Sequence, residues 1–414
     1  MQFLQKNSKT FIDRFVVAIA NLPSSPRIIH YEDDYDEKIR SLKVDQCEEA
    51  IVLHDSGSKL KLNLLLFDDR VRPLVKAFIL SSLLQLAPQT VSVIFSFLRS
   101  ISAEDIEISA LSMPIDFKLR WVTLTAKYSS DSLLALKNLL AYFCKVQFGF
   151  WSPQHTDFVS RSLPVKQRDC YSTVRSGDAF LTIEEEVKLV RWIDASTLQA
   201  KNMDKPTAEI ACLVVSSYQF GMRPKQLGMI RKRECTVRVS HEDDSSIVYL
   251  TFKMVKQLDK AMSGLTLNRK VKREWAPLFV SLMNHKKSDE NNSFLFGYSS
   301  RATLSRALID KLAEILPDSK GRVAYDLRHS MAQRLVDSGA SHEELASAMG
   351  HTRLESSLVY FRATANQAEL VNKALGISDT YKAVAKIAAN KFISISDLAN
   401  LKGEEQIAGA PHGI

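Results

Sequence analysis

Hydrophobic and polar positions alternate differently along successive parts of the chain. Short apolar segments at residues 51–53 and 62–67 are compatible with strands. From about residue 68 to 150 the apolar positions recur with the helical period, in stretches such as VRPLVKAFILSSLLQLA and DSLLALKNLLAYFCKVQF. The pattern predicts a helical domain over residues 69–152, preceded by an N-terminal region, residues 1–68, whose role it does not indicate.

A second change of pattern follows the helical domain. Residues 153–178 combine two prolines with Ser, Thr and basic residues and have weak periodicity, which is typical of a linker. FLTIEEEVKLVRWI then begins a new helix at Thr182, with acidic residues in the first turn, where the helix dipole favours them. We expect a second large domain over residues 179–375. The Ala- and Lys-rich tail, residues 376–414, predicts one or two further helices.

Length and charge favour a multidomain protein that binds a polyanion. The 414 residues exceed one ordinary core. A net charge of +8 and a pI of about 9.1 favour partners such as nucleic acid. The five cysteines have no metal-site spacing, and the chain shows neither a secretory signal nor an apolar stretch of membrane-spanning length. These features predict a cytoplasmic protein without a structural metal or a membrane partner.

An arginine is predicted at the start of a helix, where anions bind. The apolar helix at residues 207–219 stops at Gly221, because glycine tolerates the positive φ of a helix end. Arg223 follows, and Pro224 suits the first position of the next helix. Backbone N–H groups and the helix dipole favour an anion there, and the guanidinium can bind phosphate with two parallel hydrogen bonds. A solvated arginine at a helix start is the alternative.

Two lysines fall on a predicted β-hairpin. SSIVYLTFKMVKQ alternates like a strand, and LTLNRKV can pair with it. Lys253 and Lys256 face opposite sides of the first strand, with Lys256 at the turn end. A lysine on such a finger can donate a proton to a leaving oxygen, although most hairpin lysines are simply solvated.

The segment AYDLRHSMAQRLVDSGASHEELASAMGHTRLESSLVYFRA has the strongest pattern. Three apolar residues at four-residue steps predict a buried helix face: Leu327, Met331 and Leu335. This helix presents Arg328 on an adjacent face and ends at Gly339. Two Ser/Thr-x-x-Glu capping boxes, beginning at Ser341 and Thr352, then predict two short helices.

His351 and Tyr360 complete a set of residues suited to phosphate chemistry. His351 lies in the tight turn between the two short helices, and Tyr360 lies about two turns along the second, within reach of the same pocket. Each residue alone is more ordinary as a turn histidine or a core aromatic. Together with two arginines and a lysine, and with no acidic cluster to hold magnesium, they can neutralise a pentacoordinate phosphate while the tyrosine attacks it.

The second half of the chain resembles the tyrosine recombinases, or phage-type integrases. GMRPKQLGMI is similar to their first-arginine box, and YDLRHSMAQRL followed by MGHTRLESSLVYF is similar to their His-x-x-Arg, Gly-His and tyrosine boxes. The resemblance covers residues 178–375 and, more loosely, residues 68–150. It implies a mainly α fold with a small β-hairpin or sheet in the catalytic domain (α+β). The two domains would form a clamp on DNA, with an extra N-terminal region.

The resemblance also implies a role for each residue of the predicted site. Arg223 and Arg328 would bind the scissile phosphate, and His351 would hydrogen-bond it. Tyr360 would be the nucleophile and would become linked to the DNA 3′-phosphate. No cofactor, metal or nucleotide is implied, because the phosphotyrosine conserves the energy of the broken phosphodiester.

Two positions depart from the family's pattern. Tyr325 stands where the first histidine of His-x-x-Arg is usual, and Gln226 where an acidic residue is common. With a pKa near ~10, a tyrosine is a poor base, so we expect Tyr325 to orient the phosphate through its hydroxyl. His329 matches a histidine that is frequent in the family and is expected to play a supporting part. The general acid would be Lys256, whose place fits the family better than that of Lys253.

The same resemblance implies a site-specific recombinase that integrates and excises a mobile genetic element. Its partners would be double-stranded DNA attachment sites and further copies of itself, a dimer on each site and a tetramer in synapsis. Residues 376–414 would dock on a neighbouring protomer, and residues 1–68 could bind accessory DNA sites or partner proteins. A chromosome-dimer resolvase, a type IB topoisomerase and a non-catalytic DNA-binding protein with the same fold are the alternatives.

Overall fold

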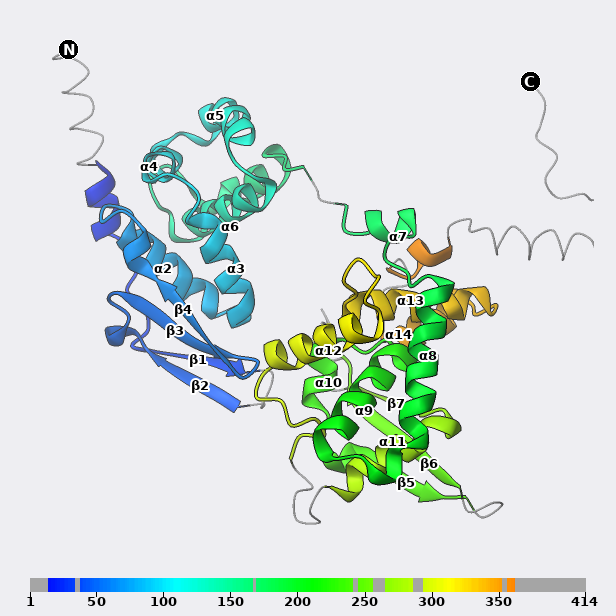
Figure 1. The fold of residues 1–414 in the computed structure, drawn as a ribbon. Helices are drawn as coiled ribbons and strands as arrows, with labels where there is room; N and C mark the ends of the chain where they lie inside the picture. The colour runs from blue at the N-terminus through cyan, green and yellow to red at the C-terminus, as the bar shows by residue number, and fades with distance from the viewer. Residues whose placement is uncertain are drawn as a thin grey trace, which may run out of the picture.

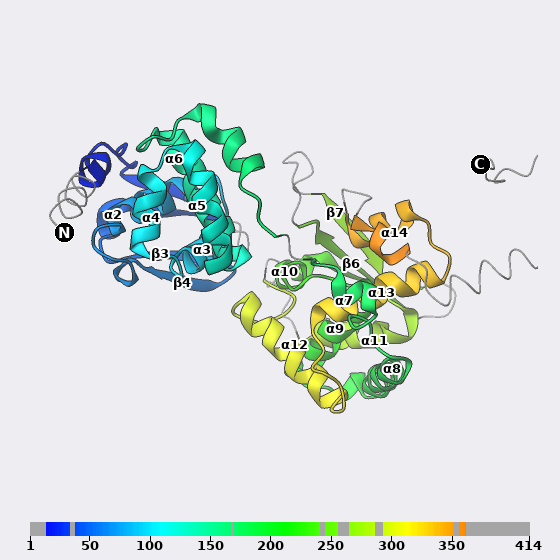
Figure 2. The same ribbon diagram turned by 90° about the horizontal axis from the view of Figure 1, so that it is seen from above.

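The computed structural model describes residues 14–33, 38–166, 169–240, 245–255, 265–285, 293–351 and 356–361. They form two bodies that lie beside one another in both views and are joined by a single linker (Figures 1 and 2). Helices predominate, and every sheet is small and antiparallel. The predicted mainly α fold with a small sheet in the second body is confirmed. The tail at residues 376–414 lies outside the described residues.

After a helical segment at residues 14–20, the first body contains two antiparallel β-hairpins. Their strands are β1 (Ile28–Asp33), β2 (Lys38–Lys43), β3 (Ala50–Asp55) and β4 (Ser58–Asn63). The predicted strand at residues 51–53 lies within β3. The one predicted at residues 62–67 ends early, at Asn63. Its side chain accepts a hydrogen bond from the N–H of Leu65, and the chain continues as a 3₁₀ turn.

Five helices follow and share a core with the hairpins. They are α2 (Arg72–Leu83), α3 (Pro88–Leu98), α4 (Ala103–Leu111), α5 (Pro114–Lys127) and α6 (Ser130–Val146). Their buried apolar side chains form one cluster with those of the hairpins, and this cluster runs from Phe15 to Leu163. The regions on the two sides of residue 68 therefore share one core.

The segment at residues 153–178 is more structured than its weak periodicity indicates. Its first part packs on α6, where the ammonium of Lys137 donates hydrogen bonds to the carbonyl oxygens of Ser160 and Leu163. Its second part contains α7 (Ser172–Ser176), and Val174 of this helix is buried in one cluster with Tyr360. The two ends of the segment are thus anchored in different bodies.

The second body is a layer of helices around a three-stranded antiparallel sheet in the order β5-β6-β7 (Figure 1). The strands are β5 (Cys235–Val239), β6 (Ser246–Lys253) and β7 (Thr266–Lys270). The helices are α8 (Ile183–Leu198), α9 (Lys205–Phe220), α10 (Pro224–Met229), α11 (Ala276–Asn284), α12 (Arg301–Ile315), α13 (Ala324–Asp337) and α14 (His342–Met349). A 3₁₀ turn, η10 (Leu358–Phe361), ends the described chain. Most of α9 is buried, so this helix forms the centre of the core.

Local signals explain several helix ends in this body. Thr182 caps α8, because its hydroxyl accepts a hydrogen bond from the N–H of Glu185. In return, the side-chain carboxylate of Glu185 accepts one from the N–H of Thr182. Ser341 and Glu344 form the same reciprocal box at α14, as predicted. The second predicted box, which begins at Thr352, lies outside the described residues.

The two bodies meet where the β3–β4 turn contacts the start of α12. The N–H of Arg301 donates a hydrogen bond of 3.1 Å to the carbonyl oxygen of Ser56. Gly57 has a φ of +75°, and a Cβ at this position would lie 2.3 Å from the carbonyl oxygen of Ser299. Both the backbone conformation and the close approach therefore require glycine here.

Candidate active site

Arg223 is positioned by the sharp turn between α9 and α10. Gly221 ends α9 with a φ of +57°, and a Cβ on it would lie 2.6 Å from Met331 Cε and 3.2 Å from Arg328 Cα. The turn thus packs directly on α13, and only glycine fits. Arg223 then takes the N-cap position of α10, with Pro224 at the first helical position, as predicted. Burial lowers the pKa of its guanidinium.

Gln226 joins this turn to the sheet. Its side chain is buried, its Oε1 accepts a hydrogen bond of 3.0 Å from the N–H of Arg223, and its Nε2 donates one of 3.0 Å to the carbonyl oxygen of Lys253. A carboxylate at this position could make only the first bond, because it has no hydrogen to donate. The departure from the family's acidic residue therefore ties the end of β6 to the start of α10.

Arg328 extends from α13 into the centre of the site. It is almost fully buried, and its Nη1 and Nη2 donate hydrogen bonds to the carbonyl oxygens of Gly221 (2.7 Å) and Met349 (2.8 Å). Burial, followed by the positive charge of Arg223, lowers the pKa of Arg328 to about 10. Within the described residues neither arginine forms an ion pair with a carboxylate. The described part of the site therefore presents positive charge without an acidic side chain that neutralises it.

His351 follows Gly350, which ends α14 with a φ of +63°. Its Nε2 lies 3.2 Å from Arg328 Nη2, and its Nδ1 lies 3.3 Å from Ser357 Oγ. Burial, together with the charges of Arg328 and Arg223, lowers the pKa of His351 to about 4. The ring is therefore neutral at pH 7, with Nε2 able to accept from Arg328 and Nδ1–H able to donate to Ser357.

Tyr360 lies in η10, and its side chain is buried beside α13. In the described part the residues around it form a 3₁₀ turn, where the sequence predicted an α-helix. Its hydroxyl lies 2.6 Å from Nδ1 of His329. Burial raises the pKa of this phenol, whereas Arg328 and Arg223 lower it, which places the hydroxyl within the electrostatic influence of both arginines.

His329 is the residue that sequence reasoning underestimated. It is 4% exposed and contacts the hydroxyl of Tyr360 directly, whereas Tyr325 is 55% exposed. The rings of Tyr325 and His329 meet edge to face, with their centroids 4.5 Å apart. Positions four residues apart share a helix face. The sequence signal for His329 was therefore its place one helical turn after Tyr325, which stands where the family usually has its first histidine.

The lysines are the least defined members of the predicted set. Lys256 lies outside the described residues. Lys253 ends β6, and its backbone is held next to α10 through Gln226. The end of β6 that carries Lys253 is therefore attached beside Arg223.

Among the described residues no three His, Cys, Asp or Glu side chains come together in a way that could hold a metal ion. Within the same residues, every helix is too short or too polar to cross a membrane.

The arrangement unites residues from four separate stretches of the chain. Arg328 of α13 contacts His351 and the carbonyl oxygen of Gly221, two residues before Arg223, and Tyr360 contacts His329 of the same helix. Residues 181–367, slightly less than half of the chain, match the Phage integrase family. This part of the chain is a phage integrase family domain. It contains every site residue named above.

Three solved structures are similar to part of the chain. XerH site-specific recombinase bound to palindromic difH substrate is 15% identical, with 73% of this chain and 82% of that chain covered and a TM-score of 0.44. Tn1549 transposon integrase in complex with transposon right end DNA is 16% identical, with 73% and 99% covered and a TM-score of 0.44. XerA recombinase is 14% identical, with 73% and 98% covered and a TM-score of 0.33. A comparison with curated proteins found no match.

Proposed function

We propose that the protein is a site-specific DNA recombinase that integrates and excises a mobile genetic element. The observation that supports this best is the convergence of Arg223, Arg328, His351 and Tyr360 in one site within a phage integrase family domain. Two uncompensated arginines suit a phosphodiester, and a tyrosine at their side suits nucleophilic attack on it.

The reaction begins when the hydroxyl of Tyr360 attacks the scissile phosphorus. A 3′-phosphotyrosine forms, and the DNA 5′-oxygen leaves with a proton from Lys256, or from Lys253 in its place. Arg223 and Arg328 neutralise the charge on the pentacoordinate phosphate, and His351 adds a hydrogen bond. Tyr325, exposed at the edge of the site, orients the phosphate. Because attack by a 5′-hydroxyl reverses the step, rejoining requires neither a metal ion nor ATP.

Double-stranded DNA is the proposed partner, held between residues 69–152 and 179–375 with the basic segment 153–178 crossing its backbone. The net charge of +8 supports this, because phosphate contacts dominate the affinity of DNA-binding proteins. The first body carries in addition the two hairpins of residues 28–63, for which we propose binding of accessory DNA or a partner protein. We place the reaction in the cytoplasm.

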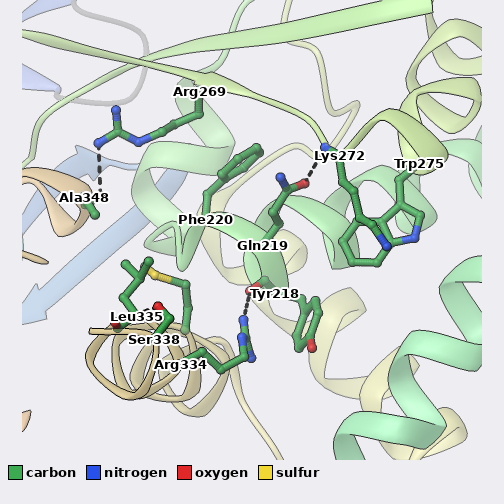
Figure 3. A pocket seen from close by; sticks show the side chains of 11 residues that line it. Tyr218, Gln219, Phe220, Arg269, Lys272, Trp275, Arg334, Leu335, Ser338 and Ala348 are labelled. Carbon is green, nitrogen blue, oxygen red and sulfur yellow. Dashed lines mark hydrogen bonds between the residues drawn. The ribbon is translucent and has the colours of Figure 1, made fainter. Parts of the chain in front are cut away.

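Assembly into a dimer on each site and a tetramer in synapsis would involve the tail. A pocket of about 440 Å³ between α9, β7, α13 and α14 offers a place for it (Figure 3). Its lining combines apolar side chains such as Phe220, Trp275 and Leu335 with the guanidinium groups of Arg269 and Arg334. Deletion of residues 377–414 should abolish the tetramer on DNA in gel-shift and light-scattering assays while leaving single-site binding intact. Unchanged assembly would remove the tail from this role.

Covalent trapping tests the proposed chemistry. Wild type and Tyr360→Phe are incubated, with EDTA present, with nicked duplexes that span the ends of the DNA element carrying the gene. A DNA-linked band on a denaturing gel that Tyr360→Phe lacks supports the recombinase reaction. If the wild type binds these duplexes and forms no band, the chain is a DNA-binding protein that has kept the fold. The same assay on two kinds of DNA distinguishes an integrase from a resolvase. An integrase should form the adduct on the junctions of the element, and a resolvase on the chromosomal dimer-resolution site.

A further inference from the structure

The hydroxyl of Tyr360 has one close polar neighbour on α13. His329 Nδ1 lies 2.6 Å from Tyr360 Oη, both side chains are almost fully buried, and their rings are tilted by 40° with centroids 5.7 Å apart. A contact this short between a phenol and an imidazole is a hydrogen bond through which a proton can pass. The contact lies within the electrostatic influence of Arg328, so it is part of the phosphate site.

A phenol that attacks phosphorus must lose its proton, and the side chains around this one limit where the proton can go. Tyr325 is itself a phenol, and a guanidinium accepts no proton. Both ring nitrogens of His351 already have partners, Arg328 and Ser357. Among the described side chains, His329 is therefore the base that touches the reacting oxygen.

We propose that His329 is a catalytic residue that takes the phenolic proton of Tyr360 during DNA cleavage and returns it during rejoining. This inference rests on the proposed recombinase function. In cleavage, the Oη–P bond forms, the P–O5′ bond breaks, the phenolic proton moves to Nδ1 and the 5′-oxygen receives a proton from the general acid. In rejoining, the 5′-hydroxyl attacks and returns its proton to the general acid. The P–O5′ bond forms, the Oη–P bond breaks, and the imidazolium of His329 protonates the departing phenolate. No proton is gained or lost over the cycle.

The charges that face His329 keep its ring neutral before DNA binds. Burial, followed by the charge of Arg328 on the same helix, lowers the pKa of His329 to about 4. The other polar groups that face it are Tyr325, Tyr360 and the neutral ring of His351. A bound phosphodiester would offset the arginine charge and raise the basicity of His329. The phenol also becomes far more acidic as its oxygen bonds to phosphorus, so the transfer accompanies the attack.

Single-turnover cleavage of the nicked duplexes by His329→Asn tests this inference. Asparagine can still hydrogen-bond Tyr360, but it cannot act as a base. We expect cleavage to slow by about 100-fold or more, with DNA affinity and thermal unfolding unchanged. The wild-type rate should rise with pH and level off, whereas that of His329→Asn should continue to rise because hydroxide replaces the histidine. His285→Asn, at an exposed position directly after α11, is the matched control.

A second measurement separates proton transfer from packing. When 3,5-difluorotyrosine replaces Tyr360, the more acidic phenol needs less help, so the defect of His329→Asn should shrink by at least about tenfold. His329→Gln provides a second variant if asparagine disturbs the fold. The inference is overturned if His329→Asn cleaves at the wild-type rate with the wild-type pH profile, or if fluorination leaves its defect unchanged. If the wild type itself forms no Tyr360-dependent adduct, the proposed function fails first.

Discussion

The bridge made by Gln226 gives a prediction whose size can be worked out. Replacing Gln226 with Leu removes its hydrogen bonds to the N–H of Arg223 and to the carbonyl oxygen of Lys253. Both backbone groups belong to residues of intermediate exposure, so water can reach them in part. Each lost neutral bond then costs about 1 kcal/mol, and the pair about 2 kcal/mol. For a unit of this size, that lowers Tm by about 4–8 °C.

Gln226→Glu is the matched variant, because the two side chains have the same shape. Glutamate keeps the acceptor for the N–H of Arg223, and its charge at the first turn of α10 is favourable. It cannot donate to Lys253, and its carboxylate faces a carbonyl oxygen. We expect a loss of stability about half that of Gln226→Leu, and a weaker attachment of the hairpin finger to the site.

Urea unfolding followed by tryptophan fluorescence, with both variants and the wild type, measures the free energies. Trp275 and Trp192 report on the second body, since both lie in or against its core. Equal losses for the two variants would show that the bond to Lys253 contributes nothing. A loss below about 0.5 kcal/mol for Gln226→Leu would refute the reasoning altogether.

Three further predictions concern other parts of the protein. Tyr325→Phe should retain most of the covalent adduct that Tyr360→Phe abolishes, and equal loss in the trapping gel would show that Tyr325 does more than orient. Asp105→Asn should destabilise the first body by about 3 kcal/mol, because this buried carboxylate accepts hydrogen bonds from Lys127, Arg120 and two hydroxyls. Burial alone would raise the pKa of the Asp105 carboxyl, but these hydrogen bonds outweigh burial and hold the pKa well below its usual range. The stability that depends on the charge of Asp105 is present above pH ~4 and lost as the pH falls below that value. Urea titrations at pH values from 7 to 3 should show this loss of unfolding free energy in the wild type, and Asp105→Asn should lack it. DNA affinity should fall linearly in log–log plots against salt, and a flat plot would argue against a phosphate-dominated interface.

Much of the site could be predicted because its signals are local. A glycine that ends a helix, a proline that starts the next and a capping box each depend on a few neighbouring residues. Arg223 at the start of α10, and α14 capped by Ser341, therefore appear as the sequence predicts. Four predicted residues, Arg223, Arg328, His351 and Tyr360, lie in one site. Lys256 stays a prediction, since it is outside the described residues.

The features that sequence reasoning missed depend on contacts between distant segments. Whether Tyr360 meets His329 or Tyr325 is decided by how η10 returns to α13, which no periodicity encodes. The same holds for α7, which is polar in composition but buries Val174 beside Tyr360. The hairpins before residue 68 likewise share one core with the helices that follow. Their alternating pattern indicates strands, but it does not indicate which other element the strands pack against.

The way Arg328 is held shows why this site suits an anion that comes from outside. Its fixed partners are carbonyl oxygens of Gly221 and Met349, which orient the guanidinium without cancelling its charge. A carboxylate partner would have stabilised the free protein more, but an incoming phosphate would then have to displace it. Elsewhere in the domain, where no substrate is expected, Arg322 is paired with Glu185. The contrast between the two buried arginines supports the proposal that the charge of Arg328 is kept for a ligand, in which case a bound phosphodiester would complete the electrostatic balance of the domain.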